Sequence, residues 1–461
     1  MTDKLLRVTD VAPSGAGIAY EDGVRIFVPG TLPGDVVRAD VTPPARGSRS
    51  GVAVPLSWET ESPWRRRTPC PASRSAPACG GCALATLSPE GQAFVTRRLL
   101  TAALAEAGVE APDPLPLMEA ETLGADFKPG FRNKAVLYPS LNAEGHWQFT
   151  LYAQGSHEPV PASVDCPQTP DWMAEAAKRI AAALDDTALT PWNEPLLTGD
   201  IRALLMREGV SEHSPERLVA LVVRDETPAV RAFADTLCAL LDDLTVDALW
   251  INRHPAAGNA VLGREGRPLT PRESIRTTIG GLTFEVRPET FLQVNPSQTE
   301  RLYAVALDWA SIGADDVFLD LYCGIGTMTL LGAPRAAKAV GVELVEASID
   351  RAKVNAELNG ISNADFFAGA VEHVLPGLIA RGLRPTTAIV DPAFKGLDET
   401  VPAMLTGLGL KRFVYVSCSP KSFARDAARF IKLGWRIERL VPVDLFPGAL
   451  HVETVAKFVR D

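Results

Sequence analysis

A cysteine near the C-terminal end of the chain stands where a predicted strand gives way to a predicted helix. Cys418 follows the apolar run 413–416 and precedes Ser419 and Pro420. A thiolate in such a place can act as a nucleophile, although a free cysteine more often serves as a small buried hydrophobic residue. Glu453 leads the last predicted strand. If that strand end lies near Cys418, Glu453 is a candidate general base, with an ordinary surface carboxylate as the alternative.

Four other cysteines have a pattern typical of metal ligands. Cys70, Cys79 and Cys82 fall in a segment rich in Pro, Arg and Gly, and Cys166 is the natural fourth ligand. The chain has seven cysteines, an odd number that argues against a disulfide framework in a cytosolic protein. Structural zinc sites more often contain two CxxC pairs, and this chain has one. The pattern therefore predicts a metal site, with an iron–sulfur cluster favoured and zinc as the rival.

Two further stretches predict a nucleoside-binding cleft. Residues 320–327 read Asp-Leu-Tyr-Cys-Gly-Ile-Gly-Thr between a predicted strand and a helix, and Glu343 ends the next strand. Glycines there let a ligand approach the backbone, and the acid can bind both ribose hydroxyls. The third glycine of a dinucleotide site is missing, which favours S-adenosylmethionine (SAM). Asp391 ends another strand, where it either belongs to an ordinary capped turn or lies at the floor of the same cleft.

The candidate site residues can meet only if the secondary-structure elements that carry them fold into suitable domains. From about residue 288, strands alternate with helices, which predicts βαβ units and a parallel sheet. Short strands with Gly/Pro turns in residues 1–57 predict a small OB-like β-barrel. The middle of the chain mixes strands and helices. A length of 461 residues is consistent with two to four domains.

Composition limits the class of protein. Hydrophobic residues make up 46% and charged residues 22%, which is ordinary for a globular protein. No apolar run is long enough for a membrane span, and no signal peptide is seen, so we expect a cytoplasmic protein without a membrane partner. The net charge of −10 argues mildly against a chain coated in nucleic acid, but RNA binding needs only a local basic patch. Residues 65–67 and 97–98 are candidates.

Together the motifs resemble the SAM-dependent RNA uridine-5-methyltransferases, in the iron–sulfur-bearing branch that modifies 23S ribosomal RNA. The resemblance covers nearly the whole chain and rests on the barrel, the four cysteines and five ordered motifs. These motifs are residues 130–134, 291–295, 320–327, 417–420 and 451–453.

The resemblance implies a multidomain α/β protein made of three parts. Residues 1–57 would form a TRAM-like, RNA-binding barrel. Residues 58–85 and 119–275 would form an iron–sulfur α+β central domain that also binds RNA. Residues 86–118 and 276–461 would form a Rossmann-like SAM-methyltransferase domain. We expect a monomer.

Roles carried over from the family complete the expected site. Cys418 would add to C6 of uracil, C5 would take the methyl group, and Glu453 would remove the C5 proton before the cysteine leaves. We expect the helix beginning at Pro420 to favour the thiolate. The base must leave its stack to react. SAM would be held by Gln293, Tyr322, Thr327, Glu343 and Asp391. A 4Fe–4S cluster would be held by Cys70, Cys79, Cys82 and Cys166.

The chain departs from the family at several positions. Ala393 and Phe394 replace a Pro and an Arg, Ser419 replaces an Asn, and the first cysteine spacing is longer than usual. Ribosomal RNA is the favoured substrate and transfer RNA the alternative. A catalytically weakened RNA-binding or assembly factor and a redox enzyme that uses the cluster are the other hypotheses.

Overall fold

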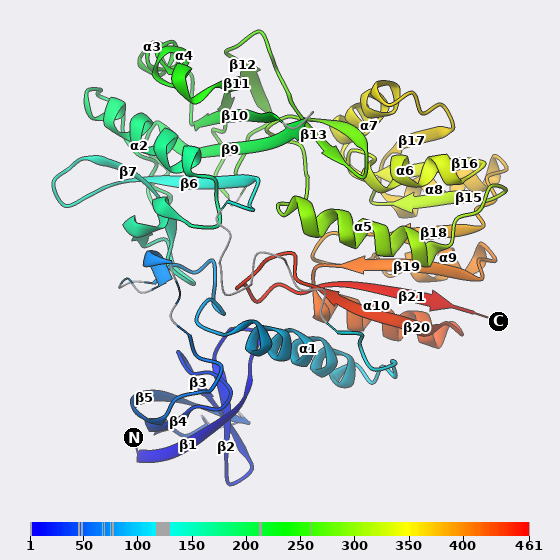
Figure 1. Ribbon diagram of the computed structural model, residues 1–461, viewed down its shortest axis with the longest axis horizontal. Helices are drawn as coiled ribbons and strands as arrows, with labels where there is room; N and C mark the ends of the chain where they lie inside the picture. Colours follow the sequence, from blue (N-terminus) through cyan, green and yellow to red (C-terminus); the bar gives the residue numbers. More distant parts are fainter. Residues whose placement is uncertain are drawn as a thin grey trace.

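The structure is a computed structural model that describes residues 2–44, 47, 49–66, 68, 70–73, 75, 78–116, 130–211, 214–258 and 260–460. Arg67 and the expected domain boundary between residues 118 and 119 lie outside these residues. The chain forms a small barrel, a central sheet with helices, and a large C-terminal α/β unit (Figure 1). Among the described helices, none combines the length and apolar character that crossing a lipid bilayer requires.

The N-terminal strands close into the predicted barrel in the order β1-β2-β3-β5-β4. Alternate residues point inward because successive side chains of a strand face opposite ways, and the interior is filled by small and branched side chains such as Val37, Ala39 and Ala53. The strands are β1 (Thr2–Val11), β2 (Gly17–Glu21), β3 (Val24–Val28), β4 (Val36–Thr42) and β5 (Ser50–Thr60).

The central part is a seven-stranded sheet in the order β12-β11-β10-β9-β6-β7-β8. The apolar face of α2 packs on it with Trp172, Met173 and Ile180. One predicted helix, 227–242, is two short helices, because Asp235 and Thr236 are weak helix formers. The strands are β6 (Lys134–Leu141), β7 (Trp147–Tyr152), β8 (Pro159–Val160), β9 (Ile201–Ser211), β10 (Ser214–Val223), β11 (Val246–Arg253) and β12 (Glu265–Pro268). The helices and 3₁₀ turns are η1 (Pro71–Ser73), η3 (Pro161–Asp165), α2 (Asp171–Asp185), α3 (Pro228–Ala234), α4 (Leu237–Leu240) and η4 (Asp242–Leu244).

The C-terminal unit contains the predicted parallel sheet, in the order β17-β16-β15-β18-β19-β21-β20. The first five of these strands run parallel, and β21 joins β19 and β20 antiparallel. The strands are β15 (Val317–Leu321), β16 (Lys338–Glu343), β17 (Ala364–Ala368), β18 (Thr387–Val390), β19 (Arg412–Ser417), β20 (Arg436–Val443) and β21 (Glu453–Val459). The helices are α5 (Pro296–Ala310), α6 (Thr327–Gly332), η5 (Ala333–Arg335), α7 (Glu346–Leu358), α8 (Val371–Ala380), α9 (Val401–Gly407) and α10 (Pro420–Lys432). A separate hairpin, β13 (Ile275–Ile279) and β14 (Leu282–Val286), precedes them.

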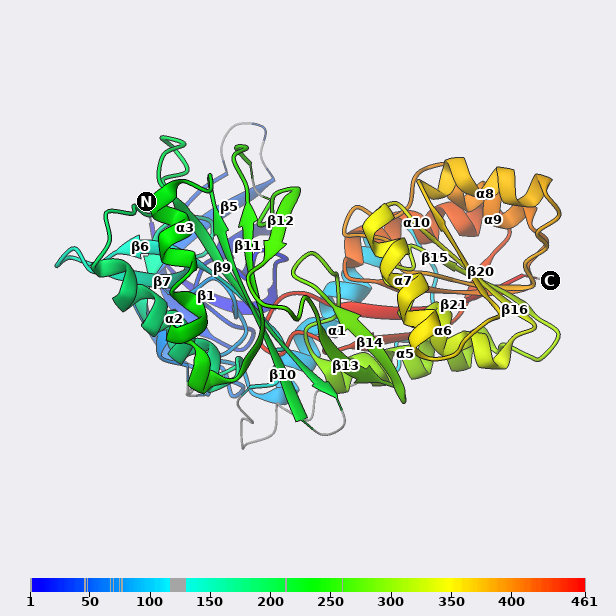
Figure 2. The same ribbon diagram turned by 90° about the horizontal axis from the view of Figure 1, so that it is seen from above.

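An early helix links the N-terminal barrel to the C-terminal unit. Helix α1 (Pro89–Glu106) begins after Ser88, whose hydroxyl accepts a hydrogen bond from the Gly91 amide and so caps the helix. Leu100 and Leu104 enter the core of the C-terminal unit, and α1 lies beside α10 (Figures 1 and 2). On the barrel side, the Arg98 guanidinium pairs with Asp10 at 2.8 Å. The helix therefore ties together two parts that are far apart in the sequence.

Candidate active site

A large cavity of about 1430 Å³ lies where the central sheet faces the C-terminal unit. Its walls come from both parts of the chain. All eleven residues that the sequence analysis singled out line it, although they span residues 70–453. They are Cys70, Cys79, Cys82, Cys166, Gln293, Tyr322, Thr327, Glu343, Asp391, Cys418 and Glu453.

Strand order explains why the cleft forms here. The chain runs from β15 outward to β16 and β17, then crosses back to add β18 on the other side of β15. Ligands in open α/β sheets bind at the carboxyl ends of the strands beside such a reversal. Asp391 directly follows β18, and the turn that begins with Tyr322 directly follows β15. The reversal therefore places these two residues on the same edge of the sheet.

The register of the last strands brings Cys418 to Glu453. Ser417, the end of β19, pairs antiparallel with Thr454 in β21. One step further along this ladder, Cys418 stands opposite Glu453, the first residue of β21. After burial, the Glu453 charge is the next largest cause of the raised pKa of the Cys418 thiol. Cys418 and Glu453, the candidate nucleophile and the candidate base, therefore lie on neighbouring strand ends.

The resting charge state of Cys418 differs from the expectation. We expected the start of α10 to favour the thiolate, yet burial, followed by the charges of Glu453 and Asp391, raises the pKa of Cys418 to about 12. Desolvation and two nearby carboxyls oppose a negative sulfur more strongly than the helix terminus favours it. Cys418 is accordingly held as a thiol in the free protein.

Buried carboxyl groups at and below the cavity floor also have raised pKa values. Burial, with the Asp391 charge adding to it, raises the pKa of Glu453 to about 8. Burial raises the pKa of Asp391 to about 7. Asp320, below the glycine turn, has its pKa raised to about 7 by burial, although it accepts a 2.6 Å hydrogen bond from the Thr329 hydroxyl. Carboxyls with pKa values near neutrality can give or take protons at physiological pH.

The glycine turn has the backbone shape of a ligand cradle. Gly324 and Gly326 have positive φ angles of 55° and 81°, and Tyr322 shares that region at 68°. A Cβ on Gly326 would lie 2.8 Å from the Phe366 ring, so a larger residue would push the start of α6 away from the sheet. The Glu343 carboxylate accepts hydrogen bonds from the amides of Gly324 (3.2 Å) and Val345 (3.0 Å). These bonds fix the acid beside the turn, as ribose binding requires.

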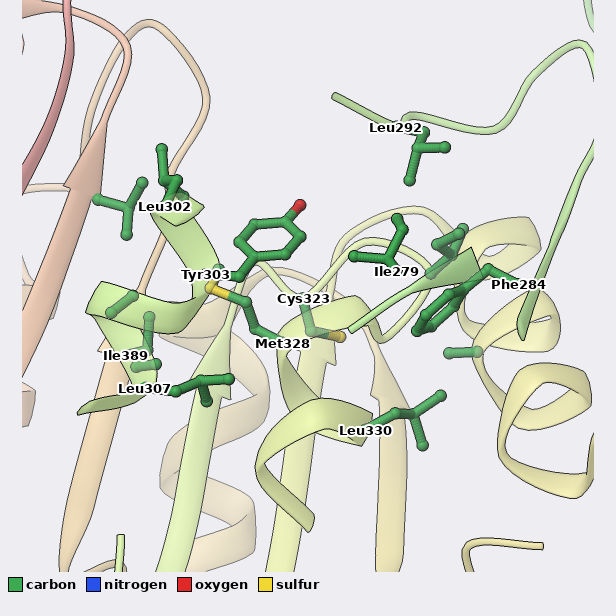
Figure 3. Close-up of a cluster of buried hydrophobic side chains, with 14 of the residues drawn as sticks. Ile279, Phe284, Leu292, Leu302, Tyr303, Leu307, Cys323, Met328, Leu330 and Ile389 are labelled. Carbon is green, nitrogen blue, oxygen red and sulfur yellow. The ribbon is translucent and has the colours of Figure 1, made fainter. Parts of the chain in front are cut away.

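Tyr303 is a site residue that the sequence patterns did not reveal. It extends from α5 above Cys323 and Met328, with its hydroxyl directed away from the packed aliphatic side chains (Figure 3). Burial, with the charges of Asp391, Asp320 and Glu453, raises its pKa well above the ordinary value. In sequence, an aromatic residue in an amphipathic helix looks like any core residue, so no local signal marks it.

The opposite wall of the cavity is basic. Arg132 and Lys134, from a motif noticed in the sequence, line it. Arg207, on β9, is buried next to Lys134 of β6 without lining the cavity, and nothing in the sequence marked it. Burial, with the charges of Arg207 and Arg132, lowers the pKa of Lys134 to about 7. Arg207 is 2% exposed and donates to the carbonyl groups of Thr290 and Pro288. Positive charge at this wall suits the phosphates of a nucleic acid.

The four cysteines come together, but not at metal-ligand spacing. Three segments bring their thiols to one end of the cavity, and burial, then the charges of Cys166, Cys70 and Cys79, raises the pKa of Cys82 to about 12. Burial also raises the pKa of Cys79 and Cys166. Within the described ranges, no group of three or more His, Cys, Asp or Glu side chains has the geometry to hold a metal ion. The donor set nevertheless fits an iron–sulfur cluster, whose usual ligands are four cysteines.

The chain is similar to RNA methyltransferases along nearly its whole length. The sequence model of the tRNA (uracil-5-)-methyltransferase family matches residues 272–460. An uncharacterised RNA methyltransferase of Listeria innocua is 31% identical over 98% of this chain and 96% of its own. One from Bacillus cereus is 32% identical over 97% and 94%.

A solved structure shares the fold. The tRNA (uracil-54, C5)-methyltransferase of Pyrococcus abyssi, in complex with S-adenosyl-L-homocysteine, superimposes with a TM-score of 0.71. The match covers 99% of this chain and 100% of that one, at 22% sequence identity.

Proposed function

The chain belongs to the SAM-dependent RNA (uracil-5-)-methyltransferase family, and on this premise we propose that it forms 5-methyluridine through a covalent bond between Cys418 and the uracil ring. The observation that carries the proposal is the register that sets Cys418 opposite Glu453 at the end of β19 and β21. Uracil C5 is a poor nucleophile by itself. Addition of sulfur to C6 converts the ring to an enolate, which makes C5 reactive.

The side chains can perform the remaining steps. SAM, when bound, supplies the methyl group. Gln293, Tyr322, Thr327, Glu343 and Asp391 would hold it, since all five line the cavity beside the glycine turn. As the bond from sulfur to C6 forms, the Cys418 thiol passes its proton to ionised Glu453, which releases that proton to solvent before the later step. After C5 has gained the methyl group, Glu453 accepts the C5 proton, and the bond from sulfur to C6 breaks as the ring regains its double bond.

The acid–base role of Glu453 implies a pH dependence. Its pKa of about 8 makes it a stronger base than an ordinary carboxylate, but it must be ionised to accept the proton. The rate of the elimination that frees the methylated base from Cys418 should therefore rise as the pH increases towards 8.

RNA carrying 5-fluorouridine tests the covalent step. Fluorine at C5 cannot leave as a proton does, so the adduct between Cys418 and the base should accumulate and survive denaturing electrophoresis. Cys418→Ala should give no adduct. Ser417→Ala, which keeps the thiol, is the matched control and should still form it. No adduct with the wild-type protein, or an undiminished adduct with Cys418→Ala, would contradict the mechanism.

We further propose that the four clustered cysteines hold a 4Fe–4S cluster with a structural role. The convergence of four thiols from three segments supports it, because thiolates are the ligands of such clusters. Protein isolated without oxygen should contain about four iron and four sulfide per chain. Cys82→Ser should lose the iron, whereas Cys238→Ser, at an exposed site, should retain it. One zinc and no sulfide would instead establish the rival metal.

For the RNA, we favour 23S ribosomal RNA, because the cysteine set resembles that of the branch acting there. Transfer RNA is the second candidate, supported by the names of the matching family and of the Pyrococcus abyssi enzyme. Mapping of 5-methyluridine in all RNA of a deletion strain distinguishes them. Methyl loss at one ribosomal position supports the first, and loss confined to transfer RNA supports the second.

An RNA-binding factor with weakened catalysis is favoured by one observation, the altered loop at Ala393 and Phe394. Calorimetric titration with SAM tests it. Undetectable SAM binding together with intact RNA affinity would support this reading and contradict the methyltransferase proposal.

A further inference from the structure

Phe394 is an apolar side chain held in an exposed place at the cavity that contains Cys418. It lies in the loop 391–396, which begins at Asp391 on the cavity floor. Its side chain and backbone together are 60% exposed. In the free protein, such a side chain gains little from burial, so packing does not account for a phenylalanine here.

The backbone that carries Phe394 is firmly anchored. The Ser422 hydroxyl donates a 2.6 Å hydrogen bond to the Phe394 carbonyl oxygen, and the Arg425 guanidinium donates one of 2.7 Å to the Lys395 carbonyl oxygen. Gly396 closes the turn with a 2.7 Å bond to the Ala393 carbonyl, at a φ of 76°. A loop pinned at three successive residues holds the ring in one region of space.

Ser422, which binds the Phe394 carbonyl, is also hydrogen-bonded to the residue that follows Cys418. Ser419, the neighbour of Cys418 and the cap of α10, donates from its hydroxyl to the Ser422 hydroxyl at 3.2 Å. The Ser422 amide donates back to the Ser419 hydroxyl at 3.3 Å. Ser419 and Phe394, two positions where the chain departs from its family, are thus joined through Ser422. This bridge links the backbone of Phe394 to Ser419, the residue next to Cys418.

Among the described residues, the Phe394 ring has one aromatic neighbour, His451. The His451 ring meets it nearly perpendicularly, with centroids 6.5 Å apart, and His451 in turn lies 5.6 Å from the Phe446 ring. These contacts restrict the ring while its exposure shows that much of its surface is free. An unstacked nucleotide base is the flat partner that RNA-binding aromatic side chains accept.

We propose that Phe394 is a stacking platform for an unpaired RNA base beside the target uridine, positioned relative to Cys418 by the bridge of Ser419 and Ser422. The inference rests on the proposed function. When a uridine leaves the base stack to reach Cys418, the adjacent bases of the RNA lose their stacking partner and expose their flat faces. An aromatic ring at the cavity entrance replaces the lost stacking, which stabilises the flipped state.

Steady-state methylation of total RNA from a deletion strain tests the platform, with labelled SAM as methyl donor. Phe394→Ala should raise the KM for RNA about 5- to 150-fold, the range expected for one stacked base. Its kcat and its affinity for SAM should stay within about twofold of wild type. Phe394→Trp should restore the KM, whereas Phe394→Leu, apolar but not aromatic, should not. Leu433→Ala, an exposed apolar site at the end of α10, is the matched control.

The bridge has its own test. Ser422→Ala should raise the KM less than Phe394→Ala does, and the double variant should resemble Phe394→Ala, because both changes disable the same contact. An unchanged KM for Phe394→Ala, full recovery with Phe394→Leu, or a loss of SAM affinity would overturn the platform. A wild-type protein that methylates no RNA would overturn the proposed function itself, which separates the two failures.

Discussion

Replacement of Glu453 by glutamine should change the stability of the protein in a strongly pH-dependent way. Glu453 is 2% exposed, and its pKa is about 8 in the folded protein against 4.5 for the free side chain. Because the folded pKa is raised, the carboxyl contributes most favourably below about pH 4.5 and loses that contribution as the pH rises through 8. The Glu453→Gln variant carries no such titration.

The size of the effect follows from the pKa values. Each pKa unit corresponds to about 1.4 kcal/mol. The raised pKa of Glu453 therefore costs the folded protein about 5 kcal/mol at pH 9, about 3 kcal/mol at pH 7 and about 1 kcal/mol at pH 5, because the carboxyl ionises more easily in the unfolded chain. Relative to wild type, Glu453→Gln should gain about 4 kcal/mol of unfolding free energy between pH 5 and pH 9. Any cost of placing an amide there is independent of pH and cancels in this comparison.

Urea unfolding at pH 5, 7 and 9, followed by circular dichroism, measures the difference. Glu438→Gln is a matched control on the neighbouring strand β20, where a 2.7 Å ion pair with Lys457 lowers the pKa of the carboxyl. That variant should show almost no change between pH 5 and 9, because Glu438 is ionised throughout. A stability difference for Glu453→Gln that stays constant within about 1 kcal/mol would refute the raised pKa and the basicity derived from it.

Three further predictions concern the same region. Alkylation of Cys418 by iodoacetamide should accelerate about tenfold per pH unit from 7 to 10, and a plateau near neutrality would contradict its raised pKa. Gly396→Ala should lower the unfolding free energy by about 1–2 kcal/mol, because φ is positive and the new methyl group would collide with Asp426. Gly407→Ala, in open space on α9, should not lower it. Asp426→Asn should lower the unfolding free energy measured with urea by about 2–3 kcal/mol, because the buried carboxylate accepts hydrogen bonds from the Tyr415 hydroxyl and the Leu397 amide. An unchanged unfolding free energy would contradict a stabilising role for these two hydrogen bonds.

Local patterns were enough to predict most elements of the C-terminal unit. The helices expected at 296–310 and 420–432 match α5 and α10, because Asn295 and Ser419 cap them and a Pro stands at the start of each. The ranges expected for α7 (346–358), α8 (371–380) and β19 (412–417) also match, although neither helix has a side-chain cap. The closed barrel was also predicted, since short alternating strands between Gly/Pro turns have few other ways to bury their apolar faces. Local sequence likewise marked Cys418, Glu343 and Asp391, each at the end of a predicted strand.

Features that depend on distant segments had no local signal. The pairing of Ser417 with Thr454, which sets Cys418 opposite Glu453, depends on the order in which β19 and β21 join the sheet. Tyr303 faces the cavity only because α5 approaches it from another part of the chain. The charge of Arg207 acts on Lys134 only because β9 pairs with β6. The protonated state of Cys418 arises from burial beside two carboxyls, and this reversed an expectation based on its own helix. Residue type and strand ends are encoded locally, whereas desolvation and charge coupling depend on what the completed fold places nearby.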